Sequence, residues 1–242
     1  MDETEDFERS IARLDTTLFA GVDGRSSEDD RMSWLALQRA VREAKPRFAY
    51  LEVGSYLGGS IQQYLLDPKC SRIYSIDKRP AAVPGARDKA GSRKENSTKN
   101  MVENLRAVAP GELHKLVCFD TDARHVDPAL IVEPPDLCFI DGEHTDHAAL
   151  SDFLFCLSVC MREATIYFHN ESWIREGIRE CLSYLKNENR PCNAYKLPGS
   201  TFAIAIGGSS VGSDQRVAEM ALDGNAWLAG DILIARSEVD LP

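Results

Sequence analysis

Residues 48–60 read Phe-Ala-Tyr-Leu-Glu-Val-Gly-Ser-Tyr-Leu-Gly-Gly-Ser, and this stretch decides the fold. The apolar run from Phe48 to Val53 predicts a buried strand, Gly54 predicts a tight turn, and a helix-like pattern follows the glycine pair. In an open α/β sheet, such a strand, turn and helix start holds a nucleotide-like cofactor. A second strand pattern over residues 72–76 ends in Asp77, whose carboxylate is placed to accept hydrogen bonds from both hydroxyl groups of a ribose.

The spacing of the glycines argues against a dinucleotide. From Gly54 the loop reads Gly-x-x-x-Gly-Gly, and Ser55 and Tyr56 stand where a G-x-G-x-x-G fingerprint needs bare backbone against a pyrophosphate. Glu52 lies inside the strand, two residues before the first glycine. A carboxylate there would repel a pyrophosphate but favours a cationic ligand such as a sulfonium or an amine.

The rest of the chain alternates strand and helix patterns, which predicts an α/β fold with a Rossmann-like, doubly wound and mostly parallel sheet covered by helices on both faces. The predicted strands are residues 48–53, 72–77, 115–119, 137–141, 165–169, 194–197 and 201–206. The predicted helices are residues 7–18, a run from Ser33 that stops before Pro46, and residues 60–66, 98–107, 147–160, 174–186 and 214–222. The turn over residues 198–200 is too short for a crossover helix, so the last two strands form an antiparallel hairpin that completes a seven-stranded sheet.

Two motifs carry a resemblance to a known family. Residues 51–60 resemble the first motif of class I S-adenosylmethionine-dependent methyltransferases, which reads acid-x-Gly-x-x-x-Gly-x-Ser in the small-molecule O-methyltransferase branch. The sequence Asp-Gly-x-His from Asp141 to His144 ends a buried-strand pattern. It resembles the fourth-strand motif of a family that includes macrolide-sugar O-methyltransferases and proteins of surface-polysaccharide clusters. The resemblance spans roughly residues 48–170.

This resemblance implies S-adenosylmethionine as the cofactor and assigns a set of contacts to it. The implied cofactor-binding residues are Glu52, Gly54, Ser55, Tyr56, Gly58, Ser60, Asp77, Asp122 and Ala123. Asp122 and Ala123 match an acid-Ala pair that contacts adenine in the resembled family, and Asp120 takes that place if the register shifts by two residues. Loop acids of this kind also commonly cap helices.

His144 is the predicted general base, with Asp141 orienting it or binding a metal. An imidazole titrates at about pH 6.5, so it can accept a proton near neutral pH. In metal-dependent relatives a second ligand pair ending in Asp follows the fifth strand, whereas this chain has His169 and Asn170 there. Asp141, His169 and Asn170 would ligate a divalent cation such as Mg²⁺, but the neutral Asn170 makes metal dependence doubtful because a hard cation prefers anionic oxygens. A softer ion held by Asp141, His144 and His169 is the alternative.

Composition limits the other functions. The chain has 242 residues, a net charge of −10 and a pI near 5.0, which argues against general nucleic-acid binding. It opens on acidic residues rather than a signal peptide, and the apolar stretch over residues 153–160 is too short to span a bilayer, so a cytoplasmic protein without membrane partners is expected. Seven scattered cysteines without a C-x-x-C pair read as buried thiols.

The sequence divides into three predicted segments: an acidic N-terminal segment over residues 1–30, a methyltransferase domain over residues 31–208, and a tail over residues 209–242. The tail reads as an edge strand, a dimer arm or a flap, and it contains an apolar piece at residues 232–234. The loop over residues 78–99 is strongly basic. It reads either as a lid that attracts an anionic acceptor, such as a phosphorylated or nucleotide-linked sugar, or as a solvated loop.

The favoured function is O-methylation of a small hydroxylated acceptor such as a sugar or a natural product. A nicotinamide-dependent oxidoreductase on the same kind of sheet is one alternative, and Glu52, the glycine spacing and the late hairpin argue against it. A non-catalytic S-adenosylmethionine-binding relative is the other, and the presence of both Asp141 and His144 argues against that. The sequence also leaves N-methylation, C-methylation and a homodimer open.

Overall fold

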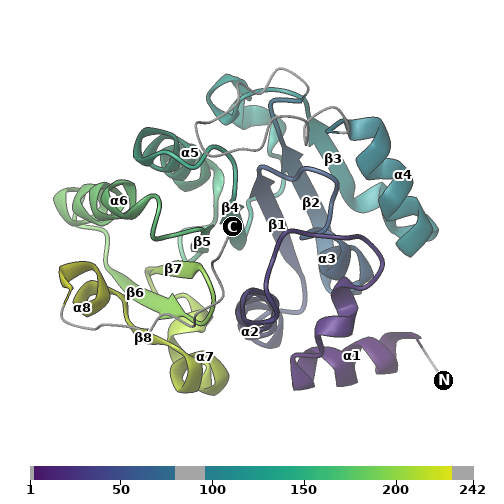
Figure 1. The fold of residues 1–242 in the computed structure, drawn as a ribbon, viewed down its shortest axis with the longest axis horizontal. Coiled ribbons are helices and arrows are strands. Elements are labelled where there is room, and N and C mark those ends of the chain that lie inside the picture. Colours follow the sequence, from purple (N-terminus) through teal and green to yellow (C-terminus); the bar gives the residue numbers. More distant parts are fainter. Residues whose placement is uncertain (1–2, 80–95, 231–242) are drawn as a thin grey trace, which may run out of the picture.

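The computed structural model describes residues 3–79 and 96–230, which form an eight-stranded sheet between two layers of helices (Figure 1). The strands are β1 (Phe48–Val53), β2 (Cys70–Ile76), β3 (Leu116–Phe119), β4 (Leu137–Ile140), β5 (Thr165–His169), β6 (Cys192–Leu197), β7 (Thr201–Ile206) and β8 (Leu222–Asp223). Their order is β3-β2-β1-β4-β5-β7-β6-β8. The first five strands run parallel, and β7 pairs antiparallel with both β5 and β6.

The predicted parallel sheet and closing hairpin are therefore confirmed, but the predicted count of seven strands is wrong. The additional strand is β8, which has two residues and pairs antiparallel with β6 through Leu222 and Asp223. Two residues are too few to show a period of two, so the sequence carries no signal for this strand.

Eight α-helices cover the sheet within the described residues. They are α1 (Glu3–Arg13), α2 (Glu28–Ala44), α3 (Gln62–Leu66), α4 (Thr98–Val108), α5 (Asp146–Val159), α6 (Arg175–Asn187), α7 (Gln215–Met220) and α8 (Gly224–Ala229). Short 3₁₀ helices are η1 (Thr16–Phe19), η2 (Pro110–Lys115), η3 (Ala123–His125), η4 (Pro128–Leu130) and η5 (Ser210–Ser213). Within the same residues, no helix has the length and apolar character needed to cross a bilayer.

Two apolar clusters, one on each face of the sheet, form the core. One joins α1, α2, α3, α4 and α7 to the sheet and contains Trp34, Tyr50 and Met101. The other joins α5, α6 and α8 to the opposite face and contains Phe153 and Trp227. The helices thus bury both faces of a sheet whose central strands are buried along their whole length, as is usual for a parallel sheet.

Helix α2 begins five residues before the predicted start at Ser33, and the reason lies in its cap. The Ser27 hydroxyl accepts a hydrogen bond from the Asp30 backbone, and the Asp30 carboxylate accepts one from the Ser27 backbone at 2.9 Å. This reciprocal capping box satisfies backbone donors at the helix start, and the acidic first turn also suits the helix dipole. The N-terminal helix differs as well, since α1 ends at Arg13 and η1 follows it, where one helix over residues 7–18 was predicted.

The carboxyl ends of β1, β2, β4 and β5 meet at one edge of the sheet, because Val53 is in register with both Ile76 and Ile140. The strand order reverses between β1 and β4, which is where ligands bind in open α/β sheets. Gly54 turns the chain at this edge with φ of +97°. A Cβ atom at Gly54 would lie 2.2 Å from the carbonyl oxygen of Asp141, so only glycine fits between the two strand ends.

Candidate functional site

A cavity of about 700 Å³ opens at this edge of the sheet. That volume falls within the range of small-molecule and cofactor sites. The predicted site residues that line it are Gly54, Ser55, Tyr56, Ser60, Asp77, Asp122, Ala123, Asp141, His144, His169 and Asn170. Glu52 and Gly58, which were also predicted to contact a cofactor, do not line it.

Glu52 lies beneath the glycine loop rather than in the cavity. Its side chain is fully buried and shares the face of β1 on which Tyr50 packs, while Val53 faces the cavity. The carboxylate accepts hydrogen bonds from Tyr50 at 2.7 Å and from Ser60 Oγ at 2.6 Å. Burial raises the pKa of Glu52 to about 8, with the hydrogen bonds from Ser60 and Tyr50 opposing the rise. Glu52 therefore holds Ser60 in place from below.

Gly58 has a packing role. Its φ is +89°, and a Cβ atom there would lie 3.0 Å from Met101 and 3.1 Å from Leu105 on α4. The glycine thus lets the loop lie close against α4. Gly59, the next residue, lies against the N-terminal segment, because a Cβ atom there would lie 2.9 Å from Cα of Gly24.

Asp77 lies at the end of β2 and faces the loop that follows β1. One carboxylate oxygen accepts a hydrogen bond from the Tyr56 backbone at 2.8 Å, and the other accepts one from the Asn96 side chain at 3.2 Å. Arg79 braces the same loop, since it is 4% exposed and donates to the Tyr56 carbonyl at 2.5 Å. Asp77 is therefore fixed at the cavity wall, where it can accept hydrogen bonds from ligand hydroxyl groups.

Asp122 caps η3, as loop acids often do, by accepting a hydrogen bond from the Arg124 backbone at 2.9 Å. The hydrogen bonds from Arg124 hold the pKa of Asp122 well below its usual range against the opposing effect of burial, and Lys78 adds to this. Lys78 Nζ lies 2.9 Å from Asp122 and 2.9 Å from Glu143. It therefore joins the loop after β3 to the loop after β4 across the cavity wall.

The predicted basic loop is described only at its two ends. Lys78 and Arg79 are engaged within the protein, and Lys99 pairs with Glu103 on α4 at 4.0 Å. The remaining basic residues of that loop, and the apolar piece at residues 232–234, lie outside the described residues.

The predicted catalytic pair is assembled at the mouth of β4. Nε2 of His144 lies 3.2 Å from Oδ1 of Asp141, and the His144 side chain is 24% exposed to the cavity. The ring of Trp173 packs edge-on against His144 with centroids 5.3 Å apart. Asn170, whose φ is +53°, lies 3.4 Å from His144 Nε2 through its Nδ2 atom. When a carboxylate accepts a hydrogen bond from one nitrogen of a neutral imidazole, the other nitrogen has the lone pair and can accept a proton.

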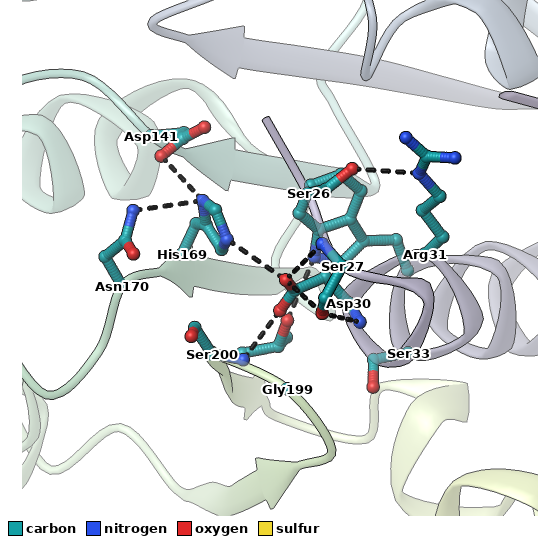
Figure 2. A network of polar contacts seen from close by, with 12 residues as sticks. Ser26, Ser27, Asp30, Arg31, Ser33, Asp141, His169, Asn170, Gly199 and Ser200 are labelled. Carbon is teal, nitrogen blue, oxygen red and sulfur yellow. Dashed lines mark hydrogen bonds and ion pairs between the residues drawn. The ribbon is translucent and has the colours of Figure 1, made fainter. Parts of the chain in front are cut away.

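His169 is held between two acids behind this pair (Figure 2). Its Nδ1 lies 3.1 Å from Oδ1 of Asp141, and its Nε2 lies 3.4 Å from Oδ2 of Asp30. Burial alone would lower the pKa of His169, but Asp141 and Asp30 raise it to about 10. Burial alone would likewise raise the pKa of Asp141, but the charge of His169 and the hydrogen bond from His144 lower it.

The residues predicted as metal ligands do not fit a divalent cation. Both ring nitrogens of His169 face carboxylates, and the pKa of about 10 that these carboxylates cause keeps both nitrogens protonated near neutral pH, so neither offers a lone pair to a metal. Asn170 is neutral, which leaves Asp141 as the single anionic ligand of the predicted set. Across residues 3–79 and 96–230, no group of three or more His, Cys, Asp or Glu side chains is arranged to hold a metal ion.

Several cavity residues were not predicted from the sequence. Asp23, Gly24, Arg25, Ser26 and Trp34 reach the cavity from the N-terminal part, and Lys78, Asn96, Asp152 and Trp173 from later elements. Gln62 fixes the N-terminal loop by accepting hydrogen bonds from the Gly21 and Val22 backbone, both at 2.9 Å. The capping-box pattern at Ser27 was the available signal for this region, since it moves the start of α2 toward the cavity.

Comparison with known proteins identifies a family and a fold. Residues 51–170 match a protein family described as a methyltransferase domain, and among curated proteins no match is found. The fold resembles three solved structures at low sequence identity. The cofactor-bound Rv0187 from MTB has a TM-score of 0.55 and 16% identity, covering 83% of this chain and 90% of that one. The O-methyltransferase TomG from Streptomyces achromogenes, involved in tomaymycin synthesis, has a TM-score of 0.52 and 14% identity, covering 82% and 90%. The TDP-rhamnose 3'-O-methyltransferase CalS11, an enzyme in calicheamicin biosynthesis, has a TM-score of 0.51 and 17% identity, covering 82% and 93%.

Proposed function

Because residues 51–170 form a class I S-adenosylmethionine-dependent methyltransferase domain, we propose that the protein methylates a hydroxyl group of a small, sugar-containing acceptor with His144 as the general base. The observation that carries this proposal is the Asp141–His144 pair, whose 3.2 Å contact lies in the wall of the same cavity as the glycine loop. The family match gives no support to the alternative of a nicotinamide-dependent oxidoreductase.

The cofactor is proposed to lie along the carboxyl ends of β1 and β2. The backbone of the loop from Gly54 to Tyr56 would hold the amino-acid part, and Asp77 would accept hydrogen bonds from the ribose hydroxyl groups. Asp122 and Ala123 would border the adenine. When bound, S-adenosylmethionine supplies a methyl group activated by its sulfonium, so the protein has to align and deprotonate the acceptor.

Deprotonation is proposed to occur at Nδ1 of His144. Nε2–H donates a hydrogen bond to Oδ1 of Asp141, which leaves the Nδ1 lone pair to take the proton of an acceptor hydroxyl. The Asp141 carboxylate also stabilises the imidazolium that forms, as an acid behind a catalytic histidine does. The acceptor oxygen then bonds to the methyl carbon as the bond from carbon to sulfur breaks.

Two side chains at the cavity support a sugar-containing acceptor. Trp173 is 44% exposed and lines the cavity beside His144, so its ring offers an apolar face next to the base. Arg25 also lines the cavity, and its guanidinium lies 5.3 Å from the centre of the Tyr56 ring. A guanidinium at this position suits a phosphate group, such as that of a nucleotide-linked sugar. The resemblance to a TDP-rhamnose methyltransferase is consistent with this class of acceptor.

The test combines binding with turnover. Calorimetric titration with S-adenosylhomocysteine should show micromolar binding, and release of S-adenosylhomocysteine from S-adenosylmethionine should be screened against TDP-rhamnose and other nucleotide-linked sugars. In His144→Ala, kcat/KM should fall by about 10² to 10⁴, whereas the affinity for S-adenosylhomocysteine should change by less than about twofold. Loss of a general base acts on the transition state and not on cofactor binding.

His147→Ala is the matched control, because His147 lies three residues further on, is exposed and does not line the cavity. Its turnover should match that of the unchanged protein. Turnover that survives in His144→Ala would remove His144 from its role, and a lack of S-adenosylhomocysteine binding would contradict the proposed cofactor site.

A further inference from the structure

A buried carboxylate from outside the matched domain reaches the back of the site (Figure 2). Asp30 lies in the first turn of α2, and it is 3% exposed. Its Oδ1 accepts a hydrogen bond from the Ser200 backbone at 2.6 Å, and its Oδ2 accepts one from the Ser27 backbone at 2.9 Å. The same Oδ2 lies 3.4 Å from Nε2 of His169.

Through His169, Asp30 is connected to the catalytic pair. Nδ1 of His169 and Nε2 of His144 lie 3.1 Å and 3.2 Å from one and the same oxygen, Oδ1 of Asp141. The four side chains therefore form a continuous chain from the protein interior to the cavity. Each link joins a ring nitrogen to a carboxylate oxygen, and such a contact is favourable only when the nitrogen carries a proton. His169 has two such links, so its ring is an imidazolium. The Asn170 amide, whose side chain lies 3.2 Å from Nδ1, then turns its oxygen rather than its nitrogen toward the ring.

We propose that Asp30 and His169 form a buried positioning pair, in which the imidazolium of His169 takes the place of a metal ion beside Asp141 and fixes that carboxylate for His144. The inference rests on the proposed function, because it gives the pair a role through His144. It accounts for the poor fit of the predicted metal ligands: a cation beside Asp141 is already present as part of the chain. Neither Asp30 nor His169 touches the acceptor in this role.

The surroundings of His169 favour a fixed charge. The ring of Trp34 packs edge-on against it at 5.3 Å and that of Phe139 lies at 6.4 Å, so apolar groups limit access of water. In such surroundings a cation between two carboxylates is held strongly, and removal of one partner leaves an uncompensated buried charge. Asp30 places a second carboxylate beside the His169 ring. The positive charge of His169 is therefore balanced by two carboxylates, and not by Asp141 alone, which also contacts His144.

A second buried ion pair lies close by and has to be considered in any titration. Lys196 Nζ lies 3.5 Å from Glu171, and both side chains are buried. Burial lowers the pKa of Lys196, with Glu171 and Asp30 acting in the opposite direction. The charged groups that face His169 are thus Asp30 on α2 and Asp141 after β4, and Asp30 in turn lies near Glu171 after β5 and Lys196 on β6.

Asp30 also has a purely structural role that the test must separate. It closes the capping box of α2 and anchors the turn at Ser200, and a Cβ atom at Gly199 would lie 2.4 Å from its Oδ1. Asp30→Asn keeps the size of the side chain but removes its charge. Ser27→Ala is the matched control, because it breaks the same capping box and removes the 2.6 Å hydrogen bond from Ser27 Oγ to Oδ2 of Asp30, while it leaves the charge of the carboxylate that faces His169.

The measurement is the protonation state of His169, read from two-bond ¹H–¹⁵N correlation spectra of the imidazole rings in the whole protein. Signals are assigned through His169→Gln and His144→Gln. In the unchanged protein and in Ser27→Ala, both ring nitrogens of His169 should stay protonated from pH 6 to pH 8. In Asp30→Asn, His169 should lose a proton at a pH lower by about one unit or more, because an opposite charge within hydrogen-bonding distance shifts a pKa by that amount.

Titration with MgCl₂ completes the test. Millimolar Mg²⁺ should leave the His144 and His169 signals in place, and a chelator should leave methyl transfer to an accepted nucleotide-linked sugar unchanged. A neutral His169 at pH 7, equal shifts in Asp30→Asn and Ser27→Ala, or a requirement for Mg²⁺ would each overturn the inference. Failure of the proposed function is a separate result, because it would appear as full turnover in His144→Ala or as no binding of S-adenosylhomocysteine while the His169 spectrum stays as expected.

Discussion

Glu52 illustrates how a single position in a strand decides between contacting a ligand and supporting the residues that do. It lies on β1 only two residues before Gly54, yet the alternation of side chains places it with Tyr50 on the face covered by α2 and α3. There it accepts hydrogen bonds from Tyr50 and Ser60. Its effect on a ligand is therefore indirect and passes through the position of Ser60 in the glycine loop.

The burial of Glu52 predicts a specific dependence of stability on pH. Its folded-state pKa is raised to about 8, so its contribution to stability is complete below the unfolded pKa of about 4.5 and is lost as pH rises through about 8. Glu52→Gln removes this titration. The difference in unfolding free energy between the variant and the unchanged protein should therefore move by about 1 to 4 kcal/mol in favour of the variant between pH 5 and pH 9. Urea unfolding at the two pH values measures it, and a difference that stays constant would contradict the buried, protonated state of Glu52.

At the scale of elements, the site depends on the contact between the loop after β1 and the end of β4. Gly54→Ala should disrupt this contact, because the added Cβ would lie 2.2 Å from the Asp141 carbonyl oxygen and the residue would keep a φ of +97°. We expect a loss of about 3 kcal/mol or more in unfolding free energy, with loss of S-adenosylhomocysteine binding.

Gly111→Ala is the control for Gly54→Ala, since a Cβ atom at Gly111 has no heavy atom within 4 Å. Its unfolding free energy should change by about 0.5 kcal/mol or less. Both free energies come from chemical denaturation, and binding comes from calorimetry. Equal effects of the two substitutions would show that the close approach of β1 and β4 does not constrain the site.

The elements that the sequence predicts well are those with a long apolar run or a motif at their end. The bounds of β1, β5 and β7 are as predicted, and the residues at the ends of β1, β2, β4 and β5 meet at one edge because parallel strands align there. The two-residue β8 and the short helix α8 have too few residues to show a period. Asp30 was missed for a different reason: its contact with His169 joins two distant parts of the chain, which no local pattern can reveal.

At the scale of the whole molecule, the first and last helices of the described residues, α1 and α8, belong to the apolar clusters that cover the sheet. Phe7 and Ile11 of α1 belong to one apolar cluster, and Trp227 of α8 belongs to the other. The predicted boundary at residue 30 passes through the first turn of α2, where Asp30 is linked to His169. Burial of this kind stabilises a single cooperative unit, and α7, β8 and α8 would then unfold together with the sheet.

Trp227 provides the test of that cooperativity. Its side chain is 7% exposed, packs on Phe202 of β7 with centroids 5.8 Å apart, and has the Arg175 guanidinium of α6 at 4.5 Å over its ring. Trp227→Ala should therefore lower the unfolding free energy of the whole protein by about 3 to 5 kcal/mol, since a large core side chain leaves a cavity behind. Leu222→Ala, at a residue that is 40% exposed in the same segment, should cost less than about 1 kcal/mol. Urea unfolding followed by far-UV circular dichroism shows whether residues 210–229 unfold with the sheet or separately. In Trp227→Ala, a single transition that moves to lower urea concentration means that they belong to the catalytic unit. An unchanged main transition means that they form a separate appendage.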